Sequence, residues 1–124
     1  EGRTVAMQGD RDFNLSGLPF PFFGKTAHFP KGPWELAAMT GAPVIVSFFR
    51  TDEHRRFHAT FHEPIWVTGS RGERQASILE GMRRYVTLLE GFVRRHPDQW
   101  YCFYPFWDDP LRKGRRPNAS DQVS

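Results

Sequence analysis

Several common sources of stability and chemistry are absent from this 124-residue sequence. Cys102 is the only cysteine, which excludes an internal disulfide and a cysteine-based zinc site and favours a reducing compartment. No apolar run approaches the roughly 20 residues that a membrane-spanning helix needs. The sequence also has no glycine-rich phosphate loop and no nucleophile elbow, so it lacks the local motifs of P-loop nucleotide-binding enzymes and of α/β-hydrolases.

Aromatic residues are abundant: the chain has twelve Phe, four Trp and three Tyr. Hydrophobic residues make up 39% and charged residues 25%, which is ordinary for a globular protein and excludes an intrinsically disordered one. A chain of this length is expected to form one hydrophobic core. Most of the net charge of +3 comes from a basic cluster near the C-terminus, which suggests anionic lipid, nucleic acid or no partner: Arg112, Lys113, Arg115 and Arg116.

The first thirty residues combine a strand-like run with a stretch rich in Phe and Pro. Residues 4–7 are predicted to form a strand, and because the chain begins at Glu1 without a signal peptide, we expect a fragment or a trimmed chain. Residues 13–30 hold five Phe and three Pro. Proline lacks an N–H donor, which excludes a helix here and leaves an irregular or edge-strand segment.

Two helices are predicted. The short one spans residues 33–40, because proline is favoured at a helix start and Gly41 can end the helix. The long one spans about residues 71–96, with Ser70 and Glu73 as a capping box. Its apolar stripe recurs at spacings of three and four: Ala76, Leu79, Met82, Tyr85, Val86, Leu89, Phe92 and Val93.

Two strands are predicted between the helices. Residues 44–49 are almost continuously apolar, which is typical of a central strand covered on both faces, as in a parallel sheet. From residue 57 the pattern alternates between a face expected to be buried and a face expected to be solvated. The buried face comprises Phe57, Ala59, Phe61, Ile65 and Val67, and the solvated face comprises His58, Thr60, His62 and Thr68.

Histidine offers three candidate sites. His58 and Glu63 have the His-x4-Glu spacing of a known catalytic pair, but on a strand they would lie on opposite faces about 16 Å apart, too far for a base and its orienting carboxylate. His58 and His62 would lie about 13 Å apart, which excludes their sharing a metal ion. His28 lies between two lysines without an evident orienting carboxylate, so it is only a weak candidate base.

Two further features have both a structural and a functional interpretation. Asp10, Arg11 and Asp12 either form an ion pair within one loop or place Arg11 beside a cleft, where its guanidinium would bind a phosphate or carboxylate. The aromatic residues of 13–29 and 100–107 either fill the core or line an acyl-chain groove and contact a membrane surface.

Six short blocks, taken in chain order, resemble the C-terminal half of the lipid A biosynthesis acyltransferase family, including relatives that acylate phosphatidylinositol mannosides. The similarity covers about residues 3–110, and Phe-Phe-Gly followed by Pro-x-Gly-Pro is its most specific part. The blocks are Gly9-Asp-Arg-Asp-Phe13, Phe22-Phe-Gly-Lys25, Phe29-Pro-Lys-Gly-Pro33, Leu36-Ala37, Thr40-Gly-Ala-Pro43 and His96-Pro-Asp-Gln-Trp100.

The resemblance implies an enzyme that moves a fatty acyl group from an acyl carrier protein or coenzyme A thioester to a hydroxyl of a membrane glycolipid or lipid A precursor. The resemblance also implies that the enzyme acts at the cytoplasmic face of the bacterial inner membrane and uses no metal or bound cofactor. The family's upstream His-x4-Asp/Glu motif and N-terminal anchor are not in this sequence, so no residue here takes the role of catalytic base. By resemblance, Asp10 and Arg11 have supporting catalytic roles, and Phe22, Phe23 and Lys25 bind substrate.

The sequence thus predicts an α/β fold with a mixed, partly parallel sheet and the two helices, as the C-terminal part of an acyltransferase-type fold. Residues 1–110 are assigned to the acyltransferase domain, and residues 111–124 to a basic, polar, disordered tail. The expected partners are the acyl donor, the glycolipid acceptor and a membrane surface, with no nucleic acid. This piece is expected to be inactive alone, and the alternative is a non-catalytic module that binds a lipid surface or a partner.

Overall fold

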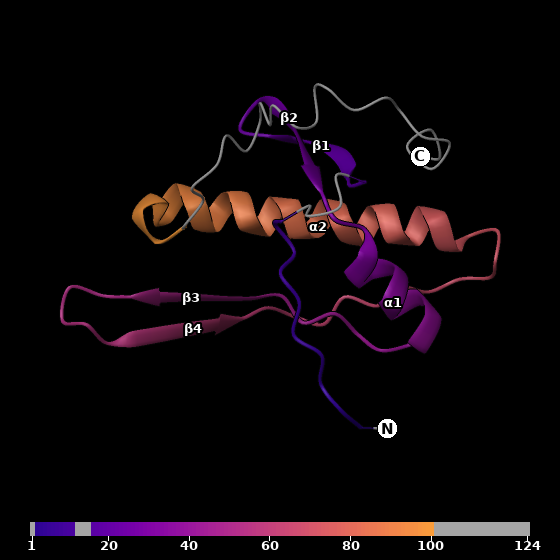
Figure 1. The fold of residues 1–124 in the computed structure, drawn as a ribbon, viewed down its shortest axis with the longest axis horizontal. Coiled ribbons are helices and arrows are strands. Elements are labelled where there is room, and N and C mark those ends of the chain that lie inside the picture. The colour runs from indigo at the N-terminus through magenta and orange to yellow at the C-terminus, as the bar shows by residue number, and fades with distance from the viewer. Residues whose placement is uncertain (1, 12–15, 101–124) are drawn as a thin grey trace.

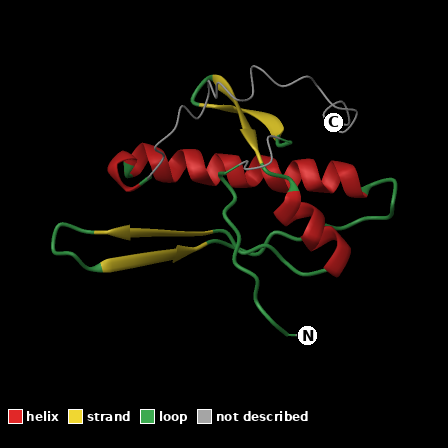
Figure 2. Cartoon of the chain, in the orientation of Figure 1, coloured by secondary structure: helices red, strands yellow, loops and turns green. Residues whose placement is uncertain are grey.

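A computed structural model describes residues 2–11 and 16–100. Its elements in chain order are β1 (Leu18–Phe22), β2 (Lys25–Phe29), α1 (Gly32–Thr40), β3 (Ser47–Thr51), β4 (Phe57–Phe61), α2 (Arg74–Arg95) and the short 3-10 helix η1 (Pro97–Gln99). Helix α2 lies at the centre, with the β1–β2 hairpin on one side and α1 and the β3–β4 hairpin on the other (Figure 1; Figure 2). The combination of helices and strands is confirmed. Every strand pairing in the described part of the chain is antiparallel, so the partly parallel sheet stays a prediction.

Strands β1 and β2 form a hairpin with a two-residue turn. Phe23 and Gly24 have φ angles of 51° and 80°, the left-handed values that a type I′ turn requires at both positions. The strands pair from Leu18 opposite Phe29 down to this turn. The two prolines of β1, Pro19 and Pro21, occupy alternate positions whose backbone nitrogens face away from β2. The N–H that proline lacks is therefore not needed for strand pairing. The edge-strand interpretation of this stretch therefore holds.

The inner face of this hairpin fills the core. Phe22 and Phe29 are fully buried, with ring centroids 5.6 Å apart in an edge-to-face arrangement. Phe20 is buried beside them, so these three rings are core residues and do not form a lipid-binding surface. Phe13, the aromatic residues at 101–107 and the tail at 111–124 lie outside the described residues. The other buried residues are Leu18, Ala27, Trp34, Ala37, Val46, Ile65, Val67, Ile78, Met82, Val86, Leu89, Phe92 and Val93.

Both helices form close to their predicted positions. Helix α1 ends at Gly41, whose φ of 74° lets its N–H bond back to a carbonyl in the last turn. Helix α2 begins at Arg74, three residues later than predicted; its N-cap is Glu73 and not Ser70, and no side-chain hydrogen bond caps it. Only the other half of the capping box forms, weakly, since the Glu73 carboxylate accepts a hydrogen bond from the Ser70 N–H at 3.4 Å.

Helix α1 contacts α2 at a glycine. A Cβ on Gly81 would lie 2.7 Å from Cζ3 of the Trp34 ring, which is closer than real Cβ atoms approach other atoms. Trp34 is buried, so its ring has little room to retreat. The absence of a side chain at this position therefore lets the ring lie directly on the helix backbone.

The second hairpin, β3–β4, changes register at a bulge. Ser47 pairs with Phe61 inside the hairpin, whereas Val44 pairs with Ile65 just beyond it. From the first pair to the second, the segment before β3 covers three residues (47 to 44) and the segment after β4 covers four (61 to 65). The segment after β4 therefore contains one extra residue. An extra residue on one side reverses which alternate side chains face the core.

The bulge explains why the predicted burial of β4 is wrong. Ile65 and Val67, beyond the bulge, are buried as expected. Phe57 and Phe61, before it, are 84% and 67% exposed, although the simple alternation places them on the same buried face. His58 lies on the opposite, partly covered side of the hairpin.

Two other strand predictions are also wrong. Residues 44–49 are not a strand covered on both faces: Val46 is buried, but Phe49 is 60% exposed, and the regular strand begins only at Ser47. Residues 4–7 form no strand, because no other described segment pairs with them. Within the described ranges, no helix is long and apolar enough to cross a membrane.

Candidate functional site

The charged loop at Asp10 is anchored from the other end of the described chain. Asp10 Oδ2 accepts a hydrogen bond of 2.8 Å from the indole N–H of Trp100, 90 positions later in the sequence. The bond is partly buried, and an ionised acceptor makes it stronger than a bond between neutral groups. The structure thus gives Asp10 a partner outside its own loop. Arg11, next to it, is half-buried, and Asp12 lies outside the described residues.

Gly9 lets the same segment lie against Tyr85. A Cβ on Gly9 would lie 2.8 Å from Cζ of the Tyr85 ring, so a larger residue does not fit without movement. Tyr85 lies between Phe29 and Trp34, with a ring-centroid distance of 6.3 Å to each. Burial, reinforced by the negative charge of Asp10, raises the pKa of Tyr85 well above its usual value of 10. The phenol therefore stays neutral at physiological pH.

The three residues predicted to bind substrate lie at the turn of the first hairpin. Phe22 is fully buried, and its ring centroid lies 5.6 Å from that of Trp100. Trp100 therefore contacts both the anchored carboxylate of Asp10 and the base of the hairpin turn. Phe23 and Lys25 are exposed beside the turn. Phe22 thus supports this region from within the core, while Phe23 and Lys25 are accessible.

Phe23 adopts a backbone conformation that is unusual for a bulky residue. Its φ of 51° is left-handed, a region that Gly and Asn enter far more readily. The ring packs edge-on against Phe22 at 4.8 Å between centroids, and the guanidinium of Arg94 lies 5.4 Å from its centre. Strained residues of this kind cluster at functional sites, so the observed angle favours Phe23 as a site residue.

Sequence reasoning does not single out Trp100 and Tyr85, although both organise this region. Tyr85 belongs to the predicted apolar stripe and so receives only a packing role, and Trp100 is considered only as one of the aromatic residues at 100–107, which either fill the core or contact lipid. The sequence does offer one signal for such a role, namely the polar group that each side chain carries: the indole N–H of Trp100 and the phenol hydroxyl of Tyr85. An indole N–H or a phenol placed on a buried face needs a hydrogen-bonding or polar neighbour, and Asp10 supplies one for each.

His58 has a carboxylate partner, but it is Asp52 and not Glu63. His58 Nε2 lies 2.8 Å from Asp52 Oδ2 at the end of the second hairpin. Asp52 Oδ1 also accepts hydrogen bonds from the backbone N–H groups of His54 and Arg56. These bonds, that of His58 first, lower the pKa of Asp52 to about 2. His58 therefore helps to fix a turn, which corrects the expectation that it is simply solvated.

The lowered pKa of Asp52 predicts how the hairpin responds to acid. Because the folded-state value of about 2 lies below the ordinary 3.8, the carboxylate stabilises the fold fully above about pH 4–5 and loses this effect as pH falls through 2. In Asp52→Asn, unfolding in urea should depend less on pH between 5 and 2 than in the parent chain. Glu63→Gln, which also removes one exposed carboxylate, serves as the control. A carboxyl titration of Asp52 by NMR with its midpoint near 4 would contradict the prediction.

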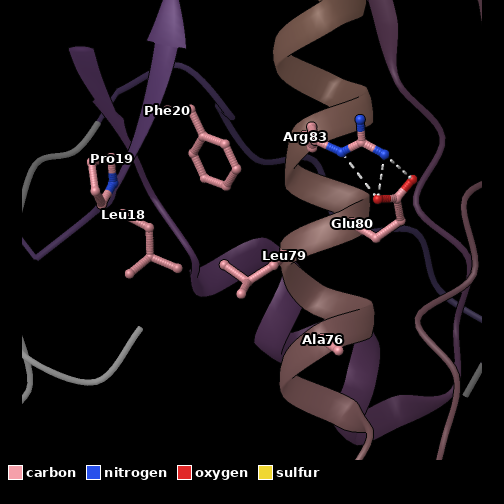
Figure 3. A pocket seen from close by; sticks show the side chains of 7 residues that line it. All are labelled: Leu18, Pro19, Phe20, Ala76, Leu79, Glu80 and Arg83. Atoms are coloured by element: carbon pink, nitrogen blue, oxygen red, sulfur yellow. Dashed lines mark hydrogen bonds and ion pairs between the residues drawn. The ribbon is translucent and has the colours of Figure 1, made fainter.

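A hollow of about 290 Å³ lies between β1 and α2. Figure 3 shows apolar side chains around it and an ion pair of 2.6 Å between Glu80 and Arg83 at its edge. The lining residues are Leu18, Pro19, Phe20, Ala76, Leu79, Glu80 and Arg83. The volume is at the lower end of the range for ligand pockets. Across residues 2–11 and 16–100, no three His, Cys, Asp or Glu side chains are grouped to hold a metal ion.

Comparison with known proteins decides the family. The sequence model of the bacterial lipid A biosynthesis acyltransferase family matches residues 1–108. The chain belongs to this family. Two curated relatives are phosphatidylinositol mannoside acyltransferases: one from Mycobacterium tuberculosis (strain ATCC 25618 / H37Rv), 27% identical over 119 residues, and one from Mycolicibacterium smegmatis, 26% identical over 121 residues.

The matches cover the chain almost completely but the relatives only in part. They include 92% and 94% of this acyltransferase-family chain, against 34% and 36% of the respective relatives. The chain therefore spans about a third of the length of the curated relatives it matches.

Proposed function

We propose that this chain is part of an acyltransferase that moves a fatty acyl group from an acyl thioester to a hydroxyl of a membrane glycolipid or lipid A precursor. Acyl carrier protein or coenzyme A would carry the acyl group, and the reaction would take place at the cytoplasmic face of the bacterial inner membrane. Family membership and the acyltransferase names of the relatives support this proposal. The thioester is a co-substrate, and no metal or bound cofactor is needed.

The observation that carries the proposal is the anchoring of the segment at residues 9–11. Gly9 lies against Tyr85, and the Trp100 indole holds the Asp10 carboxylate, so the two residues that directly precede Arg11 are held by residues of α2 and of the segment after it. A segment held in this way presents Arg11 at a defined place. Preorganised charges are effective in catalysis because they need no rearrangement as the reaction proceeds.

Arg11 has the chemistry that this position needs. Its planar guanidinium would bind an acceptor phosphate or carboxylate with two parallel hydrogen bonds, or stabilise the negative charge that develops on the thioester carbonyl oxygen. In this proposal Asp10 is a positioning residue, since its carboxylate is engaged by Trp100. Phe23 and Lys25, exposed at the neighbouring turn, would contact the substrate. The general base would come from outside these 124 residues.

Acyl transfer tests the proposal directly. The full product of the gene that encodes this chain, incubated with radiolabelled acyl-coenzyme A or acyl carrier protein and a phosphatidylinositol mannoside or lipid A precursor, should place label in the glycolipid. The 124-residue chain alone should give only the background of a boiled control. Transfer by the short chain that His58→Ala abolishes would show that His58 is a base after all. No transfer by the full gene product, with binding of the chain to lipid vesicles, would favour the non-catalytic module.

A further inference from the structure

One face of the β3–β4 hairpin is aromatic and uncovered. Phe49, Phe57 and Phe61 are 60%, 84% and 67% exposed. The register places Phe57 opposite Thr51 and Phe61 opposite Ser47, so all three rings point to the same side of the hairpin. Phe49 and Phe61 contact each other, with ring centroids 6.2 Å apart. We call this side of the hairpin, formed by these three residues, the outer face.

The inner face is already occupied. The ring of Phe48 stacks on Phe92 of α2, with centroids 4.8 Å apart and planes 13° from parallel. The hairpin is therefore attached to the core through one side only, and Figure 1 shows it extending alongside α2. The residues just beyond the hairpin also have one exposed side and one buried side: Ile45 and Trp66 are exposed, while their neighbours Val46 and Ile65 are buried.

The edges of this hairpin have no further strand beside them. In the described part of the chain β3 pairs only with β4, so each strand has an outer edge of backbone N–H and C=O groups without a strand partner. One group on the β3 edge is bonded by a side chain, since the Thr51 N–H donates to Oε1 of Gln99 at 3.0 Å, which leaves the β4 edge as the more open of the two. A two-stranded hairpin is marginal alone, and flat apolar strands with open edges commonly pair with further strands. The outer face and the two edges therefore call for an occupant that supplies both apolar cover and hydrogen bonds.

A polypeptide meets both requirements and a lipid surface meets only one. Acyl chains would cover the Phe rings, but they have no groups that can bond to the strand edges, and unsatisfied backbone groups in hydrocarbon are costly. The charges at the end of the hairpin also do not select anionic lipid, since Asp52 and Glu53 accompany Arg55 and Arg56 there. The part that this chain matches makes up 34% and 36% of the two relatives, so about two-thirds of the length of each relative lies outside the match.

We infer that the outer face of β3–β4 is an interface for a further segment of acyltransferase polypeptide, from the part of the enzyme that the relatives have outside the matched third. That segment adds a strand to an edge of the hairpin and covers Phe49, Phe57 and Phe61. The mode is strand addition, in which backbone hydrogen bonds give affinity and the alternate side chains give specificity. The inference rests on family membership and on this geometry, and it does not depend on the reaction that the enzyme catalyses.

Thiol labelling measures whether the outer face is covered. In a Cys102→Ser background, Phe57→Cys introduces a single thiol at the most exposed position of the outer face, and Arg71→Cys introduces a control thiol in the exposed turn before α2. In the 124-residue chain both thiols should react with a maleimide at similar rates. In the full gene product we expect the thiol at position 57 to react at least about tenfold more slowly, also in detergent, because a strand and its side chains cover it.

The alternatives give different results. Protection of the 124-residue chain by phosphatidylcholine–phosphatidylglycerol vesicles would assign the face to a membrane, and protection that grows with protein concentration would assign it to a second copy; either result overturns the proposal. Equal labelling of the short chain and the full gene product, or a gene product no longer than this chain, also overturns it. Phe57→Ser gives a second measurement, because it should lower the melting temperature of the full gene product and leave that of the 124-residue chain unchanged. Since labelling reports contact and not turnover, failure here is distinct from failure of acyl transfer.

Discussion

Gly81→Ala should lower the free energy of unfolding by about 1–2 kcal/mol, a fall in melting temperature of roughly 4–8 °C for a domain of this size. The new Cβ would lie 2.7 Å from the buried Trp34 ring, so either the ring or α1 has to move. Overpacking of this kind costs about 1–3 kcal/mol, and the gain in helix propensity offsets about 1 kcal/mol at most. Urea unfolding followed by circular dichroism measures the difference.

Gly91→Ala, on the same helix, is the matched control. The atoms nearest to a Cβ at this position belong to the flexible Arg95 guanidinium, at 3.8 Å or more. With no overpacking, only the helix propensity changes, so stability should rise by about 0.5–1 kcal/mol. Two identical substitutions ten residues apart are thus expected to have opposite signs. If Gly81→Ala were as stabilising as Gly91→Ala, the close packing of α1 on α2 would be wrong.

Arg11→Lys should reduce acyl transfer by about a hundredfold in the complete enzyme and change stability by no more than about 0.5 kcal/mol. Lysine keeps the positive charge but loses the planar pair of donors that binds a phosphate, a carboxylate or a developing oxyanion. Steady-state kinetics distinguish the two proposed roles. A rise in KM alone would indicate that Arg11 binds the acceptor, whereas a fall in kcat would indicate that it stabilises charge in the transition state.

The control for this substitution is Arg71→Lys, which makes the same change at an exposed turn and should leave the rate unaffected. The melting temperature is measured on the same preparations. If Arg11→Lys lowers the melting temperature by many degrees while the rate per folded molecule stays unchanged, Arg11 is a structural residue of the loop. The ion-pair interpretation of Asp10, Arg11 and Asp12 would then be correct.

Local signals suffice for the two helices and for the exclusion of a helix from the Phe- and Pro-rich stretch, but they do not predict that this stretch forms the β1–β2 hairpin. The spacing of apolar residues predicts α2 because a helix buries one face wherever it lies, and Gly41 ends α1 through its own backbone freedom. The prolines of β1 exclude a helix for an equally local reason. The start of α2 is less predictable, because Ser70 and Glu73 match a capping box by residue type while only one of its two bonds forms.

The second hairpin shows where a simple pattern misleads. The alternation from Phe57 to Val67 is regular in sequence, but an extra residue between Phe61 and Ile65 changes which side faces the core. A bulge of one residue carries no strong composition signal here, and it reverses every assignment on one side of it. The candidate site is non-local in a similar way, since the hydrogen bond from Trp100 to Asp10 joins segments that no local pattern connects.

The bond between Asp10 and Trp100 also bears on the order of folding. The two hairpins and α2 depend mostly on contacts between residues close in sequence, which form quickly, whereas this bond closes a loop that spans 90 positions. Loop closure of that length becomes favourable only once the intervening core has condensed. The segment that carries Arg11 should therefore dock last and detach first, so a moderately weakened core would lose its ordered Arg11 while its helices remain folded.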